Sequence, residues 1–200
     1  DPAAAAGWFR RAAEQGDHAA AYMLAVVLLD GRGVARDAAE AIRWLNSAAE
    51  QGDPRAQYRL GMLLEQGQDL PRDATSAAGW YLRAAEQGDA RAQYDLALMF
   101  EAGDGVEHDE AEAARWLRAA AEQGDALAQY NLGVKYATGH GVEHDDVEAH
   151  FWLSLAAASD QSAVIDASRR GVEALAERLP PPDLAKSELR LRERLAEQPS

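Results

Sequence analysis

The chain has 200 residues, contains no cysteine and carries a formal net charge of −14. The lack of cysteine excludes thiol catalysis, disulfide bonds and thiolate metal sites. Nucleic-acid binding depends on Lys and Arg that neutralise phosphates, so nucleic acid and anionic membranes are not expected partners of so acidic a chain. The longest uncharged apolar run, 19–29, is shorter than the roughly 20 residues that a membrane-spanning helix needs, so we expect no membrane insertion.

A repeat of 36 residues organises the chain, and tryptophan and tyrosine mark it most clearly. The tryptophans are Trp8, Trp44, Trp80, Trp116 and Trp152, and the tyrosines at the same step are Tyr22, Tyr58, Tyr94 and Tyr130. A fixed period without insertions indicates one structural unit that is copied and stacked, because each unit buries its apolar face against the next.

Each unit is predicted to contain two helices, of which the first is illustrated by the second full unit. This helix begins after Asp53, a good N-cap residue, and ends before Gly67, which can adopt the left-handed conformation of a C-cap. Residues four apart share a helix face, so Ala56, Leu60 and Leu64 are predicted to face the core. A small residue that allows close helix packing follows the central leucine in every unit. These residues are Ala25, Gly61, Ala97 and Gly133.

The second helix of each unit contains the tryptophan and is predicted to begin after an aspartate. The aspartates are Asp1, Asp37, Asp73, Asp109 and Asp145, and three of them are followed by Glu40, Glu112 and Glu148. A Glu three residues after the cap has the spacing of a capping box. Tryptophan shares a stripe at helical spacing with Ala41 and Leu45, so we expect the tryptophans to lie in the core.

Residues 161–200 depart from the period. Val164 and Leu175 belong to an amphipathic helix predicted over 161–179, which would cover the last hairpin, since the ends of a solenoid need polar caps. Three prolines end this helix, and Asp183 is predicted to cap a final charged helix.

The pattern A-x-x-x-L-G-x-x-Y-x-x-G-x-G-V-x-x-D-x-x-x-A-x-x-W-x-x-x-A-A resembles the Sel-one-like repeat, a relative of the tetratricopeptide repeat. The last full unit matches it at Ala128, Leu132, Gly133, Tyr136, Gly139, Gly141, Val142, Asp145, Ala149, Trp152, Ala156 and Ala157. The resemblance implies an all-α solenoid of helix-turn-helix repeats, wound as a right-handed superhelix over 1–160, with capping helices in 161–200. The predicted units are a half unit, 1–17, and four full units, 18–53, 54–89, 90–125 and 126–161.

The G-x-G loops between the helices of a unit are interpreted as structural turns. A dinucleotide site needs a preceding strand and a third glycine, and neither is present. In the second unit, Asp69 and Leu70 replace the second glycine and the valine of the loop. Aspartate tolerates the left-handed region better than most residues, so we expect the turn to form there too.

Three loop histidines, His108, His140 and His144, lie near carboxylates in the sequence. Imidazole and carboxylate are suitable ligands for a transition metal, which makes these histidines weak candidates. Because Asp109 and Asp145 are needed as helix caps and the loops are solvated, the sequence favours a chain without metal or other cofactor.

The tyrosines of the first helices are the strongest candidates for a binding surface. At about 100° per residue, Tyr58 and Met62 lie opposite the predicted core stripe. The resemblance to tetratricopeptide proteins implies that this face is concave, where a groove could hold an extended peptide, a helix or a folded surface. Alternatively, each tyrosine packs between neighbouring first helices, and the two roles are compatible. The predicted binding residues are Tyr22, Val26, Arg55, Tyr58, Met62, Arg91, Tyr94, Leu98, Tyr130 and Val134.

These patterns favour a scaffold or adaptor that binds another protein or a peptide. The sequence shows no serine elbow, zincin motif or paired-carboxylate site, so no enzymatic activity is predicted. Two alternatives remain open, namely a cell-wall-related enzyme or regulator, as the resemblance allows, and a passive spacer within a longer chain. We expect a monomer from the bacterial periplasm or cytoplasm, and further repeats upstream, because the chain begins without Met inside a unit.

Overall fold

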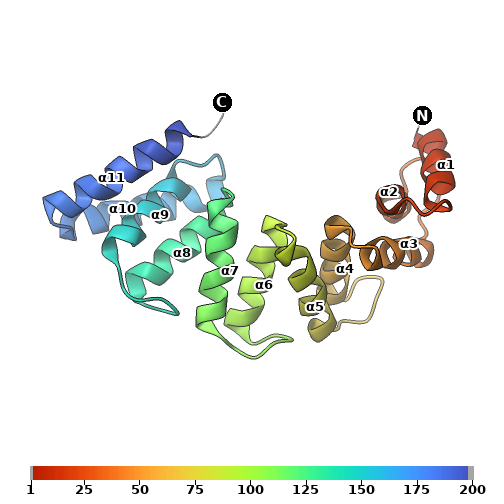
Figure 1. Cartoon of the computed structure of the whole chain (residues 1–200), viewed down its shortest axis with the longest axis horizontal. Coiled ribbons are helices and arrows are strands. Elements are labelled where there is room, and N and C mark those ends of the chain that lie inside the picture. The colour runs from red at the N-terminus through yellow and green to blue at the C-terminus, as the bar shows by residue number, and fades with distance from the viewer. Residues whose placement is uncertain (1, 198–200) are drawn as a thin grey trace. The chain divides into compact units, whose positions relative to one another are not determined.

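The computed structural model describes residues 2–197, and this part of the chain forms eleven α-helices and no strand (Figure 1). The helices are α1 (Pro2–Ala13), α2 (His18–Asp30), α3 (Ala38–Glu50), α4 (Pro54–Gln66), α5 (Ala74–Glu86), α6 (Ala90–Ala102), α7 (Glu110–Glu122), α8 (Ala126–Thr138), α9 (Asp146–Ala157), α10 (Ser162–Arg178) and α11 (Pro181–Ala196). The helices pack in consecutive pairs, which confirms the predicted all-α repeat array. Asp1, a predicted cap, lies outside the described residues.

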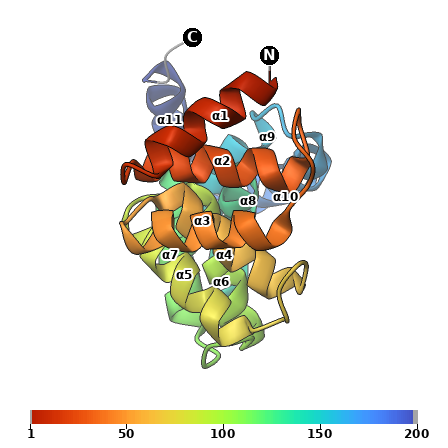
Figure 2. The same cartoon turned by 90° about the vertical axis from the view of Figure 1, so that its right-hand side faces the viewer.

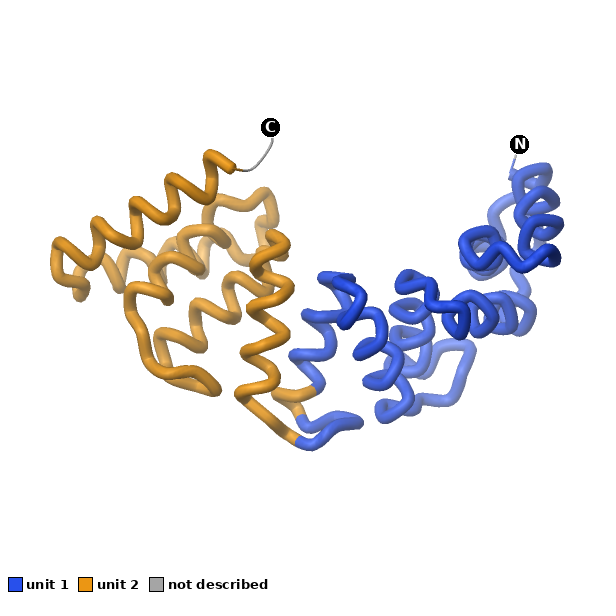
Figure 3. Tube along the Cα trace, viewed as in Figure 1, with its two compact units in different colours: residues 1–99, 103–107 blue, residues 100–102, 108–200 orange. Residues whose placement is uncertain are grey.

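The chain forms two compact units, which Figure 3 shows in different colours. Unit 1 comprises residues 1–99 and 103–107, and unit 2 comprises residues 100–102 and 108–200. In unit 1 each helix packs on the next from α1 to α5, and Figure 2 shows α1, α2 and α3 stacked in chain order. In unit 2, α7 packs on α8, α8 on α9, and both α10 and α11 pack on α9. We call α2, α4, α6 and α8 the first helices of the repeats.

Aspartate caps and glycines define the ends of the repeat helices as predicted. An Asp53 carboxylate oxygen accepts a hydrogen bond from the Ala56 N–H at 3.3 Å, and the Asp37 carboxylate accepts one from the Glu40 N–H at 2.8 Å. Gly67 follows α4 with a φ of 68°, the left-handed C-cap conformation. Glycine adopts this conformation without the steric strain that a Cβ atom causes. Side-chain oxygens at the start and glycine at the end therefore satisfy backbone groups that the helix leaves free.

Only the aspartate half of the predicted capping box forms. Instead of reaching back to the backbone of Asp37, the Glu40 carboxylate accepts a hydrogen bond from Trp44 Nε1 at 3.1 Å and pairs with Arg10 of α1. The N–H of Asp37 donates to the Leu28 carbonyl at 3.1 Å, so it has no need of the glutamate. The glutamate thus joins two helices rather than capping one.

The core consists mainly of alanine and leucine. The predicted core residues Ala56 and Leu60 are buried, but Leu64 is only half-buried, and Leu63 takes its place with 5% exposure. The contact that decides this is tertiary: Leu63 packs in the cluster that also contains Leu45. The predicted stripe was therefore displaced by one residue at the end of α4.

The prediction that the tryptophans lie in the core is wrong for Trp8 and holds only in part for Trp44 and Trp80, which pack against the edge of the core cluster. Trp116 and Trp152 are buried, whereas Trp44 and Trp80 are half-buried and Trp8 is 66% exposed. Trp8 lies on α1, which packs on α2 and leaves its other face open in the described chain. The position in the repeat is constant, but burial depends on what packs against it.

In three of the interhelical loops the second glycine lies close to the start of the second helix of the preceding repeat. These glycines are Gly33, Gly105 and Gly141. Gly141 has a φ of 73°, and a Cβ on it would lie 2.1 Å from the Glu110 carbonyl oxygen of α7. In the second unit Asp69 occupies the equivalent position with a φ of 60°. The turn therefore forms with aspartate, as predicted, and Arg36 pairs with the Asp69 carboxylate at 2.5 Å.

The C-terminal residues form a helical hairpin that continues the packing on α9. Contrary to prediction, Asp183 does not cap α11 but lies in its first turn, because the helix already begins at Pro181. Proline suits this position, since it lacks only an N–H that would have no partner. Between α9 and α11, His150 Nδ1 lies 2.9 Å from the Ser187 hydroxyl, and both side chains are buried. None of the described helices is long and apolar enough to cross a membrane.

Candidate functional site

Within unit 1, the arginine of one first helix covers the tyrosine of the preceding first helix. Arg55 Cζ of α4 lies 4.7 Å from the ring centroid of Tyr22 of α2, and Arg91 Cζ of α6 lies 4.5 Å from that of Tyr58 of α4. Such cation–π contacts hold both groups in a fixed orientation. Tyr22 and Tyr58 therefore each contact the next first helix, and both remain half-buried.

The same arginines are held in place by the caps of their own helices. Arg55 pairs with Asp53 at 2.7 Å, and Arg91 pairs with Asp89 at 2.8 Å. The hydrogen bond to Asp89 holds the pKa of Arg91 above its ordinary value. The arginine side chains remain 43% and 58% exposed, respectively. Each arginine is thus fixed by a carboxylate and a ring and still accessible to a ligand.

The ring of Tyr58 also packs against the ring of a second tyrosine. Its ring centroid lies 5.6 Å from that of Tyr81 on α5, which is fully buried and donates a hydrogen bond to Glu65 at 2.7 Å. Burial and the neighbouring Asp95 raise the pKa of Tyr58, and burial and Glu65 raise that of Tyr81. Both phenols are therefore protonated donors at neutral pH. The repeat pattern did not predict Tyr81, because this position is leucine in three other units.

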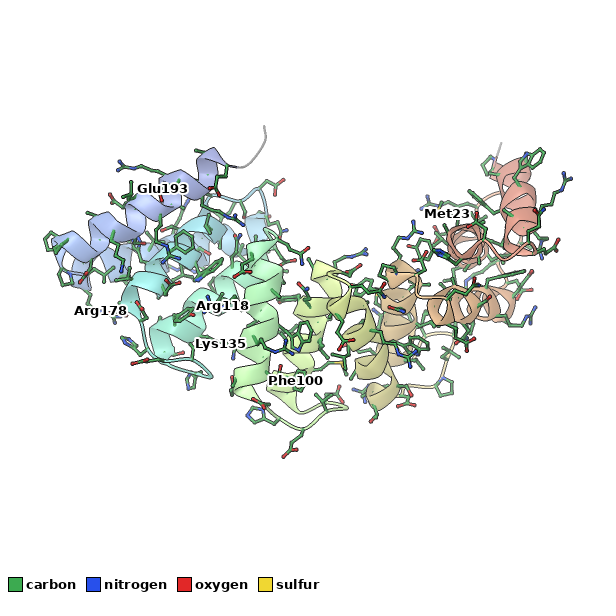
Figure 4. All side chains as sticks on the ribbon, in the orientation of Figure 1. Met23, Phe100, Arg118, Lys135, Arg178 and Glu193 are labelled. Atoms are coloured by element: carbon green, nitrogen blue, oxygen red, sulfur yellow. The ribbon has the colours of Figure 1, made fainter. Side chains whose placement is uncertain are left out.

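Aliphatic side chains lie one helical turn after the tyrosines. Val26 and Met62 are half-buried, whereas Leu98 and Val134 are 36% and 37% exposed. Met23 of α2, labelled in Figure 4, is a further exposed apolar residue at 37% that the sequence analysis missed. Tyr94 of α6 and Tyr130 of α8 are half-buried, like the earlier tyrosines.

In unit 2, α8, α9 and α10 enclose a pocket of about 240 Å³, which we call the apolar pocket. It is lined by Tyr130, Val134, Ala137, Leu153, Ala167, Gly171, Ala174, Leu175 and Arg178. Two of the predicted binding residues, Tyr130 and Val134, thus form one wall. The α10 wall was not predicted, although Ala167, Gly171 and Ala174 have the spacing of one helix face and could have indicated a surface of small residues.

A second pocket of about 400 Å³, which we call the polar pocket, shares Tyr130 and Val134 with the first. Its lining is completed by Glu101, Glu110, Asn131, Lys135, Thr138 and His140. Lys135, labelled in Figure 4, extends from α8 and pairs with Glu101 at 2.7 Å and with Glu110 at 2.5 Å. Burial alone would lower the pKa of Lys135, but the two carboxylates keep it above its ordinary value. Lys135 in turn lowers the pKa of Glu110.

The three candidate histidines have different partners, and His108 has two, since its Nε2 also lies 3.8 Å from Glu110 Oε1. His108 Nδ1 lies 2.8 Å from the Glu101 carbonyl oxygen, and His140 Nδ1 lies 2.8 Å from the Thr138 hydroxyl. His144 pairs with Asp146 at 3.1 Å. Among residues 2–197, no three His, Asp or Glu side chains are grouped so that they could hold a metal ion.

The stacked hairpins and the repeated exposed residues of the first helices define an α-solenoid repeat protein. The Sel1 repeat matches residues 1–17, 18–53, 54–89, 90–125 and 126–160, so the chain belongs to the Sel1 repeat family. Arrays of this family typically mediate protein interactions and are generally not catalytic.

Three solved structures illustrate the similarity. A Sel1 repeat protein from Oxalobacter formigenes is 32% identical, with a TM-score of 0.80 over 97% of this chain and 80% of that chain. The protective antigen c5321 of uropathogenic Escherichia coli is 26% identical, with a TM-score of 0.49 over 98% of this chain and 57% of that chain. The immunity protein Pa5087 from Pseudomonas aeruginosa is 18% identical, with a TM-score of 0.47 over 90% and 78% of the two chains. No curated protein matches the chain.

Proposed function

We propose that this protein is a scaffold that binds a partner protein or peptide through the exposed side of its first helices. We call this side the tyrosine face. Its residues are Tyr22, Val26, Arg55, Tyr58, Met62, Arg91, Tyr94, Leu98, Tyr130 and Val134. The observation that carries the proposal is the repeated combination of a half-buried tyrosine with an apolar residue one turn later, which is half-buried in α2 and α4 and exposed in α6 and α8.

The composition of this face is that of an interface core. Tyrosine, methionine and arginine are enriched at protein interfaces. Tyrosine and arginine are also frequent among the few residues that carry most of the binding energy. An isolated exposed apolar residue has no such meaning, but here the same combination recurs on successive first helices.

The face is also ordered before a partner binds. Arg91 is held by both Asp89 and the Tyr58 ring, and Tyr58 rests on buried Tyr81. Binding therefore immobilises few side chains, and the entropy that association usually loses at such residues is small. This arrangement supports recognition by a rigid surface.

Charge substitutions on the face provide the test. The double variant Leu98→Glu/Val134→Glu places carboxylates on two exposed positions of the face, and Leu82→Glu on α5 is the matched control, because Leu82 is 38% exposed outside the face. All three forms are used in a cross-linking pull-down from the native organism, followed by titration of the captured partner. We expect the double variant to bind at least about tenfold more weakly and the control to bind normally.

Equal binding by the double variant and the unchanged chain would show that the tyrosine face is not the binding surface. If no partner is captured by any form, the passive-spacer alternative gains support instead. Thermal unfolding of each variant checks that the substituted chains are folded. Neither this alternative nor the cell-wall enzyme gains a specific observation from the described residues.

A further inference from the structure

We infer that unit 2 carries a two-part peptide subsite, in which the apolar pocket takes one large apolar side chain and the polar pocket takes a neighbouring Lys or Arg. The inference rests on the proposed function, because it assigns a ligand chemistry to one part of the tyrosine face. Tyr130 and Val134 line both pockets, so one short segment can reach the two at once.

The size of the apolar pocket favours a side chain over a whole small molecule. Sites for drug-sized ligands have roughly 300–1,000 Å³. The apolar pocket, with about 240 Å³, is smaller than this and suits a single anchoring residue of a partner. Anchoring of one apolar residue in a groove is a common mode of peptide recognition.

Small residues on α10 create this pocket. A Cβ on Gly171 would lie 2.8 Å from Leu153 Cδ1, so with any larger residue at this position the Leu153 side chain would have to move. Ala167 and Ala174 lie on the same side of α10 and leave the space in front of Tyr130 unfilled. The cavity therefore follows from the helix sequence and needs no movement to form.

The arginine at the rim of the apolar pocket does not make it an anion site. Arg178, labelled at the end of α10 in Figure 4, pairs with Asp146 at 2.5 Å. The carboxylate compensates its charge, and the other lining residues of this pocket are uncharged. A peptide carboxylate would have to compete with Asp146, so the rim favours a neutral apolar group.

The polar pocket, in contrast, presents two carboxylates to solvent, and the His108 imidazole also lies near one of them, with Nε2 3.8 Å from Glu110 Oε1. Glu101 and Glu110 share the single ammonium group of Lys135, which leaves one net negative charge among these three residues. The Lys135 side chain is only 6% exposed, whereas the Glu101 and Glu110 side chains are 30% and 37% exposed. A ligand therefore meets carboxylate oxygens, and the net charge of −14 attracts a basic segment over longer distances.

Selection from a phage-displayed library of short random peptides tests this subsite on the full chain. We expect the enriched sequences to combine a large apolar residue with Lys or Arg close by. One enriched peptide is then synthesised and titrated by fluorescence anisotropy. Replacing its apolar residue by Ala, or its basic residue by Met, should each weaken binding about tenfold or more.

Protein variants locate the site. Ala174 is an exposed residue at the rim of the apolar pocket, so Ala174→Phe fills the pocket without entering the core, and Ala163→Phe on the same helix is the matched control. For the charge, Glu110→Gln is compared with Glu122→Gln, an exposed glutamate outside both pockets. We expect about tenfold weaker binding for Ala174→Phe and Glu110→Gln, and unchanged binding for the controls.

The outcomes separate this inference from the proposed function. Peptide binding that survives Ala174→Phe but is lost in Leu98→Glu/Val134→Glu would overturn the subsite and leave the tyrosine face standing. Failure to enrich any peptide, or enrichment of acidic peptides, would also overturn the subsite. If Ala174→Phe does not fold, Glu110→Gln compared with Glu122→Gln locates the site, and the peptide substitutions still test its chemistry; unchanged binding by Glu110→Gln then overturns the subsite.

Discussion

Gly61 of α4 lies against the ring of Tyr81 of α5, so that a Cβ on Gly61 would be 2.6 Å from the ring carbon Cδ1. One unit earlier the equivalent residues are Ala25 and Leu45, both of which are buried in the core. A larger residue on the second helix is thus accommodated by a smaller one on the first. The exchange brings a phenol into the core, where Glu65 accepts its hydrogen bond and its ring supports Tyr58.

Gly61→Ala should therefore destabilise the chain. An added methyl group in a filled core typically costs about 1–3 kcal/mol in the free energy of unfolding. The double variant Gly61→Ala/Tyr81→Leu recreates the Ala25 and Leu45 pair and should be more stable than Gly61→Ala alone. Urea unfolding followed by circular dichroism measures both. No gain in the double variant would show that the two residues are not coupled.

Two loop glycines allow the energetic cost of a left-handed backbone to be measured apart from the cost of a steric contact. Gly124 and Gly141 have φ values of 93° and 73°, but a Cβ on Gly124 would meet nothing within 4 Å, whereas one on Gly141 would reach the Glu110 carbonyl oxygen. Gly124→Ala should cost about 1–2 kcal/mol, the price of a left-handed alanine. Gly141→Ala should cost clearly more, because α7 must also move. Equal melting temperatures of the two variants would contradict the close contact.

The buried ammonium group of Lys135 should be stable only because Glu101 and Glu110 supply counter-charges. The variant Glu101→Gln/Glu110→Gln leaves a buried ammonium group without a counter-charge, which typically costs about 3–5 kcal/mol. Adding Lys135→Met removes that charge and should restore most of the lost stability, as measured by urea unfolding. The single variant Glu110→Gln, which is used in the peptide-binding test, keeps Glu101 as a counter-charge, so the chain should remain folded. A triple variant no more stable than the double variant would argue against the buried charge.

Mild acid should loosen α11 from α9 through His150. Its burial lowers its pKa, an effect that the neighbouring Glu188 partly opposes. The unfolded chain therefore binds a proton more readily than the folded chain. Stability is fully present above about pH 6.5, the ordinary value of histidine, and decreases as the pH falls towards the lower folded pKa. The protection of the α11 amides, taken as the observed exchange rate relative to the intrinsic rate at each pH, should decrease as the pH falls from about 7.5 to about 5.5.

The control for this pH effect is another histidine of unit 2. His150→Gln should reduce the loss of protection in α11 on acidification, whereas His140→Gln should preserve this loss, because His140 is exposed and lies in the loop after α8. An unchanged pH profile in His150→Gln would assign the effect to other groups.

Local features of the fold could be predicted because they depend on neighbours in the chain. Asp53 caps α4 and Gly67 ends it through hydrogen bonds that span only a few residues. The left-handed turn at Asp69 is equally local. The capping role of Glu40 was wrong because a distant partner, Arg10, competes for the carboxylate.

That the tyrosine face binds a partner remains a prediction, but part of its geometry could be predicted from the sequence. The tyrosine positions follow from the repeat, and the structure adds what fixes them, such as Arg91 above Tyr58. The apolar pocket could not be predicted, because one of its walls comes from α10, which departs from the repeat. Its existence depends on how closely Gly171 approaches Leu153, a distance that spacing along the chain does not encode.

The 36-residue repeat thus determined by itself that the chain is an array of helical hairpins, because helix periodicity, capping and turn conformation are short-range effects. Only the tertiary structure decided how deeply each repeated position is buried. Trp8 and Trp152 occupy the same position in their units, yet one is 66% and the other 5% exposed. The physical reason is that burial depends on the neighbouring helices, and these differ between α1 and α9.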